Sequence, residues 1–334
     1  MPWKASVAAP TRGGARGWRG SRPMYGQRGG SAREPSWLVA AGMLTVLLVW
    51  GMGWPIIRLA LDSFPPLGLA GTRLLLGGLS LLVLTRLLRL PLPTDRSTWR
   101  VLLGTGVLLN TMSPGLVFWG QTLVPAGLAS LLYAAMPIFV ALLAHRALEG
   151  DRLTAERIVG ILLGFGGVAL VTLAGATLPR QVPLSGMAAI LGGAAAWAIG
   201  IVWLRRAQPR VHPLVQVAVQ TICGGLVLSV ASLAWERQPW VVSPLSVAIY
   251  VYLLVVQVGI AQTAYVWLVG RVGPNRVAYL SYGVPFVAVV GSNLLLGEVL
   301  PPSSLLGGLL LVGGLVLVNR HPSPRRWSVA RRRP

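Results

Sequence analysis

Residues 285–302, PFVAVVGSNLLLGEVLPP, decide the fold because the chain contains the same pattern twice. The stretch opens on a proline, stays apolar for about three helical turns and ends in one glutamate beside two prolines. Residues 137–154, PIFVALLAHRALEGDRLT, also begin with a proline, continue with an apolar run and end in a Gly–acid corner. This recurrence indicates an internal repeat that spans about half of the chain.

The composition is that of a membrane protein. Of the 334 residues, 54% are hydrophobic and only 11% are charged, whereas soluble domains carry about 25% charged residues. Apolar runs near the length of about twenty residues needed to cross a bilayer recur along the chain, and the alternation of a transmembrane barrel is absent. We predict an all-α integral membrane protein with ten transmembrane helices, at residues 37–57, 66–87, 100–119, 126–147, 157–176, 185–204, 213–234, 245–269, 276–296 and 302–319.

The two halves align along their length. A shift of 147 residues places Trp50 on Trp197, and a shift of 148 places Pro137 on Pro285. Each copy then holds five spans. Because five is odd, the second copy must enter the bilayer from the opposite side, as in many secondary transporters. The sequence therefore predicts two inverted five-helix repeats, at residues 36–177 and 184–319.

Basic residues predict the orientation. With the N-terminus inside, 25 of the 29 basic residues fall on the cytoplasmic side, in agreement with the positive-inside rule. Both termini are therefore expected in the cytoplasm. Residues 1–35 and 320–334 are basic and poor in apolar side chains, so we predict disordered tails that contact anionic lipid rather than nucleic acid. Cys223 is the single cysteine, which excludes an intrachain disulfide.

Several local motifs resemble the EamA-type drug/metabolite transporters. They are Trp50–Gly51 in the first span, Arg73 in GTRLLL, and the mid-helix proline and Gly–acid turn of spans 4 and 9. One departure is Asp151, which stands where the second copy has Glu298. The resemblance covers about residues 37–319. It implies a secondary transporter of amino acids, related metabolites or drugs that works by alternating access in the bacterial cytoplasmic membrane, usually as an exporter.

Pro137 and Pro285 are predicted to bend their helices. Proline lacks an N–H donor, so the carbonyls of Tyr133 and Ser281 lose their usual partners. Broken helices at membrane depth normally face protein or a wet cavity. We expect spans 4 and 9 to bend around a central pathway; a simple packing kink is the alternative.

Arg73 is the strongest candidate for a substrate contact. It lies seven residues, or about 10 Å, inside the second span, where an ionisable residue marks a functional position. It could bind a carboxylate or phosphate group of a substrate. The alternatives are that its side chain extends to the outer surface or pairs with Asp62. Arg58, closer to the interface, is expected to be an anchor.

Further cavity candidates are polar or aromatic residues within the spans. Interhelical hydrogen bonding is the alternative role for each of them. Tryptophans near the span ends are expected in the interfacial belt, namely Trp54, Trp99, Trp119, Trp240 and Trp267. The cavity candidates besides Arg73 are Trp50, Tyr133, Trp197, Gln257, Gln262, Ser281 and Tyr282.

The acidic residues lie outside the span interiors. Glu149, Asp151, Glu156 and Glu298 stand at span ends, where they can cap helix N-termini or take part in gating. A proton relay normally needs an ionisable group inside the membrane, so we expect transport without a buried carboxylate. The glycines of spans 5 and 10 are expected to pack helices closely, with a homodimer contact as a further possibility.

A membrane-embedded enzyme acting on lipid-linked substrates is the competing function. Such chemistry needs clustered carboxylates, histidines or a metal site, and the sequence shows no such cluster. It also lacks a GxxxxGK[ST] nucleotide-binding motif. We therefore expect no enzymatic activity, no cofactor and no metal.

Overall fold

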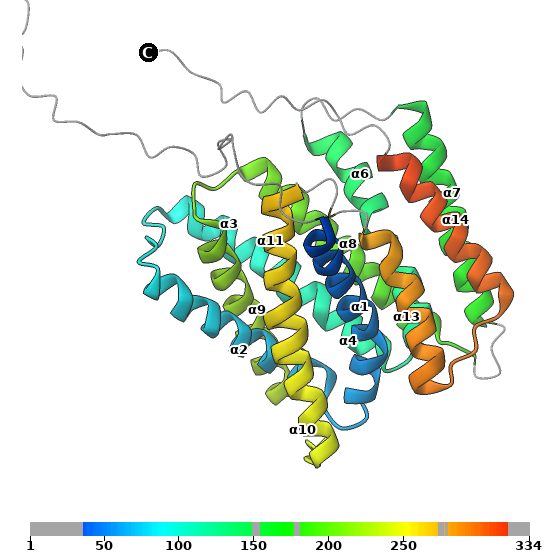
Figure 1. Cartoon of the computed structure of the whole chain (residues 1–334), viewed down its shortest axis with the longest axis horizontal. Coiled ribbons are helices and arrows are strands. Elements are labelled where there is room, and N and C mark those ends of the chain that lie inside the picture. Colours follow the sequence, from blue (N-terminus) through cyan, green and yellow to red (C-terminus); the bar gives the residue numbers. More distant parts are fainter. Residues whose placement is uncertain (1–35, 149–153, 177–180, 273–276, 278–279, 320–334) are drawn as a thin grey trace, which may run out of the picture.

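The computed structural model describes residues 36–148, 154–176, 181–272, 277 and 280–319. The two predicted basic tails lie outside these residues, as do Glu149 and Asp151. The described chain is a bundle of helices that lie roughly side by side (Figure 1). Eight of its helices are long and apolar enough to cross a membrane, and two shorter apolar helices, Tyr282–Leu296 and Pro302–Val318, complete the set within the described residues.

The ten predicted spans are confirmed. The predicted ranges 66–87 and 302–319 coincide with the observed helices, and the others differ from theirs by a few residues. The elements are α1 (Ser36–Ala60), α2 (Pro66–Leu87), α3 (Arg96–Gly106), η1 (Val107–Met112), α4 (Ser113–Gln121), α5 (Ala126–Tyr133), α6 (Met136–Ala147), α7 (Ala155–Ala176), α8 (Leu184–Ala207), α9 (Pro213–Trp235), α10 (Pro244–Val251), η2 (Tyr252–Ala261), α11 (Gln262–Val272), α13 (Leu280–Leu296) and α14 (Pro302–Asn319).

Within the described residues, three of the spans are built from several elements. The third span contains the π-helical segment η1 between α3 and α4, and the eighth contains η2 between α10 and α11. The fourth span is divided between α5 and α6. Since the third and eighth spans occupy the same place in the two repeats, the π-helical segments are equivalent. Such segments are frequent at functional sites.

The packing of α7 against α14 shows the inverted symmetry directly. A Cβ atom placed on Gly314 would lie 2.3 Å from the carbonyl oxygen of Gly160, and one on Gly167 would lie 2.5 Å from that of Gly307. In the repeat alignment Gly160 matches Gly307 and Gly167 matches Gly314. The two contacts are therefore copies of each other, related by a pseudo-twofold axis, and the two helices meet backbone to backbone.

The packing of α2 against α9 repeats this symmetry. A Cβ on Gly78 would lie 2.8 Å from the backbone nitrogen of Ile222, and one on Gly225 would lie 2.4 Å from that of Leu75. The shift of 147 residues relates Gly78 to Gly225 and Leu75 to Ile222, so these two contacts are also copies of each other. Two inverted five-helix repeats are thus confirmed, and small residues fix both of their close helix pairs.

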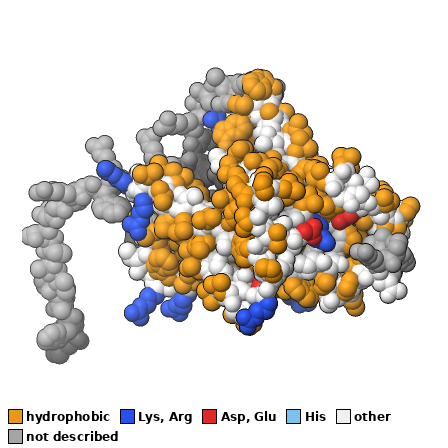
Figure 2. All heavy atoms as spheres, turned by 90° about the horizontal axis from the view of Figure 1, so that it is seen from below, with side chains coloured by type: hydrophobic (Ala, Val, Ile, Leu, Met, Phe, Trp, Pro, Cys, Tyr) orange, Lys and Arg blue, Asp and Glu red, His pale blue; other side chains and the backbone are white. Residues whose placement is uncertain are grey.

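The core and the outer surface are both apolar. A central cluster, which includes Leu69, Leu128, Leu132 and Ile190, is fully buried and draws on helices of both repeats. Outward-facing side chains are apolar as well, and Leu233 is 84% exposed. Apolar side chains cover most of the face shown in Figure 2, where charged groups are few. This surface matches a lipid environment.

Asp95 begins the third span by capping α3. Its carboxylate accepts hydrogen bonds from the Ser97 hydroxyl at 2.7 Å and the Thr98 N–H at 2.7 Å. These bonds stabilise the ionised form and lower the pKa of Asp95 to about 2.

A titration can test this cap. Because the folded pKa lies below the ordinary value of 3.8, the cap contributes fully above pH 3.8 and is lost as the pH falls through about 2. We expect the amide signal of Thr98 to shift over that range. An Asp95→Asn variant, which can cap without titrating, should show no such shift; a midpoint at or above pH 3.8 in the unmodified protein would contradict the expectation.

Candidate functional site

A polar and aromatic cluster lies where α1, α2, α4 and η2 meet. Its centre is Arg73 on α2, whose side chain is 9% exposed. The Nη1 group of Arg73 donates a hydrogen bond to Oε1 of Gln257 on η2. The guanidinium carbon lies 5.0 Å from the centroid of the Phe118 ring on α4, a cation–π contact. The Nε atom of Arg73 is buried without a hydrogen-bond partner.

Gly53 on α1 makes room for Gln257. A Cβ at Gly53 would lie 2.0 Å from the Nε2 atom of Gln257. At the repeat-related glycine, Gly200, a Cβ would instead lie 2.7 Å from the side chain of Leu109 on η1. A shift of 148 residues relates Leu109 to Gln257. The scaffold is thus symmetric at this point, whereas the polar chemistry is present on one side alone.

Tyr133, at the end of α5, makes a separate set of contacts. Its hydroxyl lies 3.3 Å from the Ser113 hydroxyl, and its ring centroid lies 5.5 Å from that of Trp54. The main-chain carbonyl of Trp54 accepts a hydrogen bond from the Gln121 side chain at 3.3 Å. Trp54, which was predicted for the interfacial belt, is half-buried and packs against the central core.

The other predicted cavity residues make different contacts. Trp50 lies one helical turn before Gly53 on α1, and its ring centroid is 5.0 Å from that of Tyr265. The hydroxyl of Tyr282 donates to the Leu315 carbonyl at 3.5 Å, an interhelical hydrogen bond. Half-buried Trp197 lies on α8, and half-buried Gln262 begins α11. Ser281 lies in α13, and its side chain is outside the described set.

The two repeated prolines lie in different surroundings. Pro137 stands in the first turn of α6, directly after the break at residues 134–135. Pro285 lies inside α13, which runs from Leu280 to Leu296. Pro137 therefore stands at the start of a helix, whereas Pro285 lies in the interior of one. That both prolines border a transport pathway stays a prediction.

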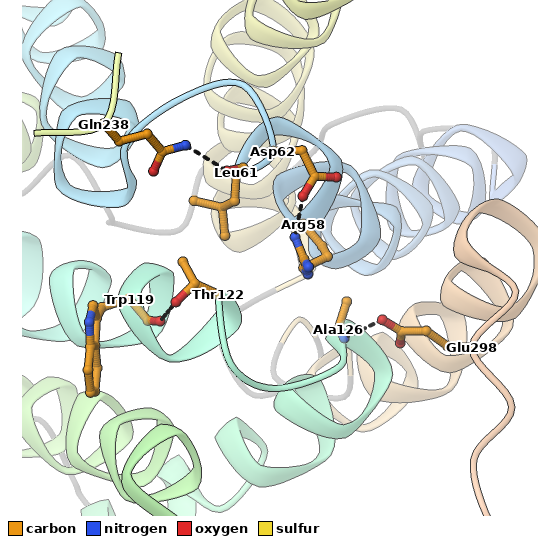
Figure 3. Close-up of polar contacts among 8 residues, drawn as sticks. All are labelled: Arg58, Leu61, Asp62, Trp119, Thr122, Ala126, Gln238 and Glu298. Carbon is orange, nitrogen blue, oxygen red and sulfur yellow. Dashed lines mark hydrogen bonds and ion pairs between the residues drawn. The ribbon is translucent and has the colours of Figure 1, made fainter. Parts of the chain in front are cut away.

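Arg58 and Asp62 form an ion pair at one end of the bundle, with Arg58 Nη1 at 2.8 Å from Asp62 Oδ1. Figure 3 shows the two side chains pointing toward each other. The pair is exposed, so its contribution to stability is small. Its main consequence is for Arg73: the alternative in which Asp62 neutralises that arginine is wrong.

Two glutamates of the second repeat bind helix starts of the first, and we call them the glutamate clamps. The carboxylate of Glu298 accepts hydrogen bonds from the N–H groups of Ala126 and Gly127 at 2.9 and 3.0 Å, at the start of α5. The first of these bonds is drawn in Figure 3. Each N–H meets its own carboxylate oxygen, and the negative charge lies at the positive end of the helix dipole.

The second clamp has the same form. Glu236, just after α9, accepts the N–H groups of Leu67 and Gly68 at 2.8 and 3.0 Å, at the start of α2. The sequence indicated a cap at Glu298 but gave no indication of Glu236. The available signal was a lone acidic residue directly after a long apolar span.

The link between α9 and α10 is fixed to the turn between α1 and α2. The side chain of Gln238 donates to the Leu61 carbonyl at 3.4 Å, and the Val241 N–H donates to the Ser63 carbonyl at 2.9 Å. Together with the Glu236 clamp, these bonds tie the second repeat to the first at this end of the molecule, as Figure 3 shows for Gln238.

Comparisons with known proteins agree with this architecture. The chain is 31% identical over 282 residues to the uncharacterized transporter YvbV of Bacillus subtilis, covering 82% of this chain and 89% of that protein. It is 32% identical over 300 residues to a probable terminal-alkyne amino-acid exporter of Streptantibioticus cattleyicolor, covering 86% and 95%. It is 30% identical over 279 residues to the uncharacterized inner membrane transporter YedA of Escherichia coli, covering 83% and 89%.

The fold and the family follow from two further matches. A solved crystal structure of a protein 22% identical in sequence superposes with a TM-score of 0.57 over 84% of this chain and 96% of the other. The sequence model of the EamA-like transporter family matches twice, at residues 37–173 and 184–320. The chain is a multi-pass membrane transporter and not an enzyme, and it belongs to the EamA-like transporter family.

Proposed function

We propose that the protein exports amino-acid-like metabolites across the bacterial cytoplasmic membrane. The observation that carries this proposal is the buried guanidinium of Arg73, which lies against the Phe118 ring inside an apolar bundle. Such a mixture of one charge and aromatic surface suits a small molecule with a charged head and an apolar side chain. The relative named as a probable terminal-alkyne amino-acid exporter supports this substrate class and direction.

Alternating access between the two repeats is the proposed mechanism. Inverted repeats can adopt two states of similar energy that open to opposite sides. The pairs α7–α14 and α2–α9 meet backbone to backbone and serve as the rigid parts of the motion. With both termini in the cytoplasm, the glutamate clamps lie at the outer face. The described state is then held together at that face, and opening to the outside requires the clamps to separate.

Transport is expected to be independent of a proton gradient. The acidic residues within the described ranges lie at helix ends or links, namely Asp62, Asp95, Glu156, Glu236 and Glu298. No carboxylate among them stands where a relay across the bilayer would need it. In proteoliposomes, an imposed pH gradient should change the rate of metabolite release less than twofold. Release that requires the gradient would contradict this expectation.

Release of trapped substrate tests the proposed function. The purified full chain is reconstituted into liposomes loaded with a mixture of the common amino acids, and the external medium is analysed by mass spectrometry. We expect protein-dependent release of a subset of them, while protein-free liposomes retain all. If correctly folded protein releases no amino acid, the proposed function is wrong.

A further inference from the structure

Arg73 is a buried cation that no described carboxylate neutralises. Asp62, the nearest acidic residue in the sequence, is paired with Arg58. Glu236 and Glu298 bind main-chain N–H groups at the end of the bundle. A buried charge without a counter-charge is costly, and a guanidinium cannot lose its proton to avoid that cost. The position is therefore electrostatically suited to an anion.

Neutral groups hold the guanidinium in place. Gln257 accepts a hydrogen bond from Nη1, and the Phe118 ring lies against the guanidinium face. These contacts fix its position and plane without cancelling its charge. The buried Nε, which has no hydrogen-bond partner, lies with Nη2 on an edge that the Gln257 contact does not use. That edge has the spacing that binds a carboxylate through two parallel hydrogen bonds.

We propose that this edge of Arg73 is the subsite for the carboxylate of the exported metabolite, with Gln257 as the positioning residue. The inference rests on the proposed export of amino-acid-like molecules and names the contact that selects them. One arginine supplies one positive charge, which matches a monovalent carboxylate better than a phosphate monoester of nearly two negative charges. The Phe118 ring gives the rest of the molecule an apolar surface beside the guanidinium.

Gly53 offers a way to disturb the subsite without changing either partner. A methyl group at this position would meet the Nε2 atom of Gln257 at 2.0 Å. The end of a glutamine side chain can move away, so Gly53→Ala should fold normally. The displaced amide would no longer hold Arg73 in the orientation that presents its free edge.

The test compares acids with their amides. Purified full-length protein is titrated with each common amino acid and with its primary amide, which keeps the side chain but removes the carboxylate. We expect the acids to bind at least 10-fold more tightly than the amides. In Arg73→Gln, acid binding should weaken by about 10- to 100-fold, and the difference between acid and amide should disappear. Arg73→Lys should lose at least 10-fold, and Gly53→Ala should fall between Arg73→Lys and the unmodified protein.

Arg58→Gln is the matched control, because it removes an arginine from the same end of the molecule but one already paired with Asp62. It should bind acids like the unmodified protein. If Arg73→Gln fails to fold, Gly53→Ala and Arg73→Lys still decide the question. Equal binding of acids and amides by the unmodified protein, or tighter binding of alkyl phosphates than of carboxylic acids, would overturn the proposal.

The outcomes separate this proposal from the proposed function. Carboxylic acids without an amino group could bind in an Arg73-dependent manner while liposomes release no amino acid. The subsite would then stand, although amino-acid export would be wrong. Release of amino acids that Arg73→Gln leaves unchanged would support export and overturn the subsite.

Discussion

Replacing Gly314 by alanine is expected to destabilise the transporter by about 1–3 kcal/mol, the usual cost of overpacking. The new Cβ would lie 2.3 Å from the carbonyl oxygen of Gly160 and 2.6 Å from the backbone nitrogen of Gly164. Both atoms belong to the backbone of α7, so no side chain can rotate away and the two helices must separate. Thermal unfolding of the purified protein in detergent measures the loss. A leucine at the same position should prevent recovery of folded protein.

The neighbouring residue provides the control. Gly313 is exposed, and a Cβ there would meet nothing within 4 Å. Because alanine is favoured over glycine in a helix by about 1 kcal/mol, Gly313→Ala should leave stability unchanged or raise it slightly. The two adjacent substitutions are thus expected to act in opposite directions. Similar unfolding temperatures for both variants would show that α7 and α14 are not packed as described.

The repeat made most of the fold predictable from the sequence. The lengths of the apolar runs predicted the helices. The shift of 147 residues that relates the two repeats also places the glycines of span 5 on those of span 10. Close packing through Gly160 and Gly314 follows from that pattern, because small residues at helical spacing let two backbones approach. The partner of each glycine, by contrast, depends on the three-dimensional arrangement and became known from the structure.

The candidate site was predictable only in part. Arg73 was identified because a charge inside an apolar span is costly and therefore informative. Its partner Gln257 was one of several polar residues in the spans, and nothing local distinguishes it from Gln262. The break of symmetry at Gly53, where a glutamine replaces the leucine of the other repeat, appears only when the two packing sites are compared. Glu236 was missed because its target, the start of α2, is 168 to 169 residues away in the chain.

The Glu298 clamp gives the second large effect. Glu298→Gln removes the negative charge and replaces one of the two accepting oxygens by an NH₂ group, which faces an N–H donor at the start of α5. From the strength of hydrogen bonds to charged groups and of helix caps, we expect a loss of about 2–3 kcal/mol in the free energy of unfolding. Faster hydrogen exchange at Ala126 and Gly127 should accompany it, because these amides lose an acceptor.

Asp62→Asn is the matched control for this change, because it also converts a carboxylate to an amide at the same end of the bundle. Its ion pair with Arg58 is a surface contact in which the Asp62 side chain is 65% exposed, so the loss should stay below about 1 kcal/mol. The exchange rates at Ala126 and Gly127 should not change in this variant. Because the carboxylate of Glu298 comes from one repeat and the bound N–H groups from the other, only the Glu298 variant should loosen the contact between the repeats at this face. Equal losses in the two variants would mean that Glu298 stabilises the protein no more than an ordinary surface charge, and the clamp could not then hold this end of the bundle closed.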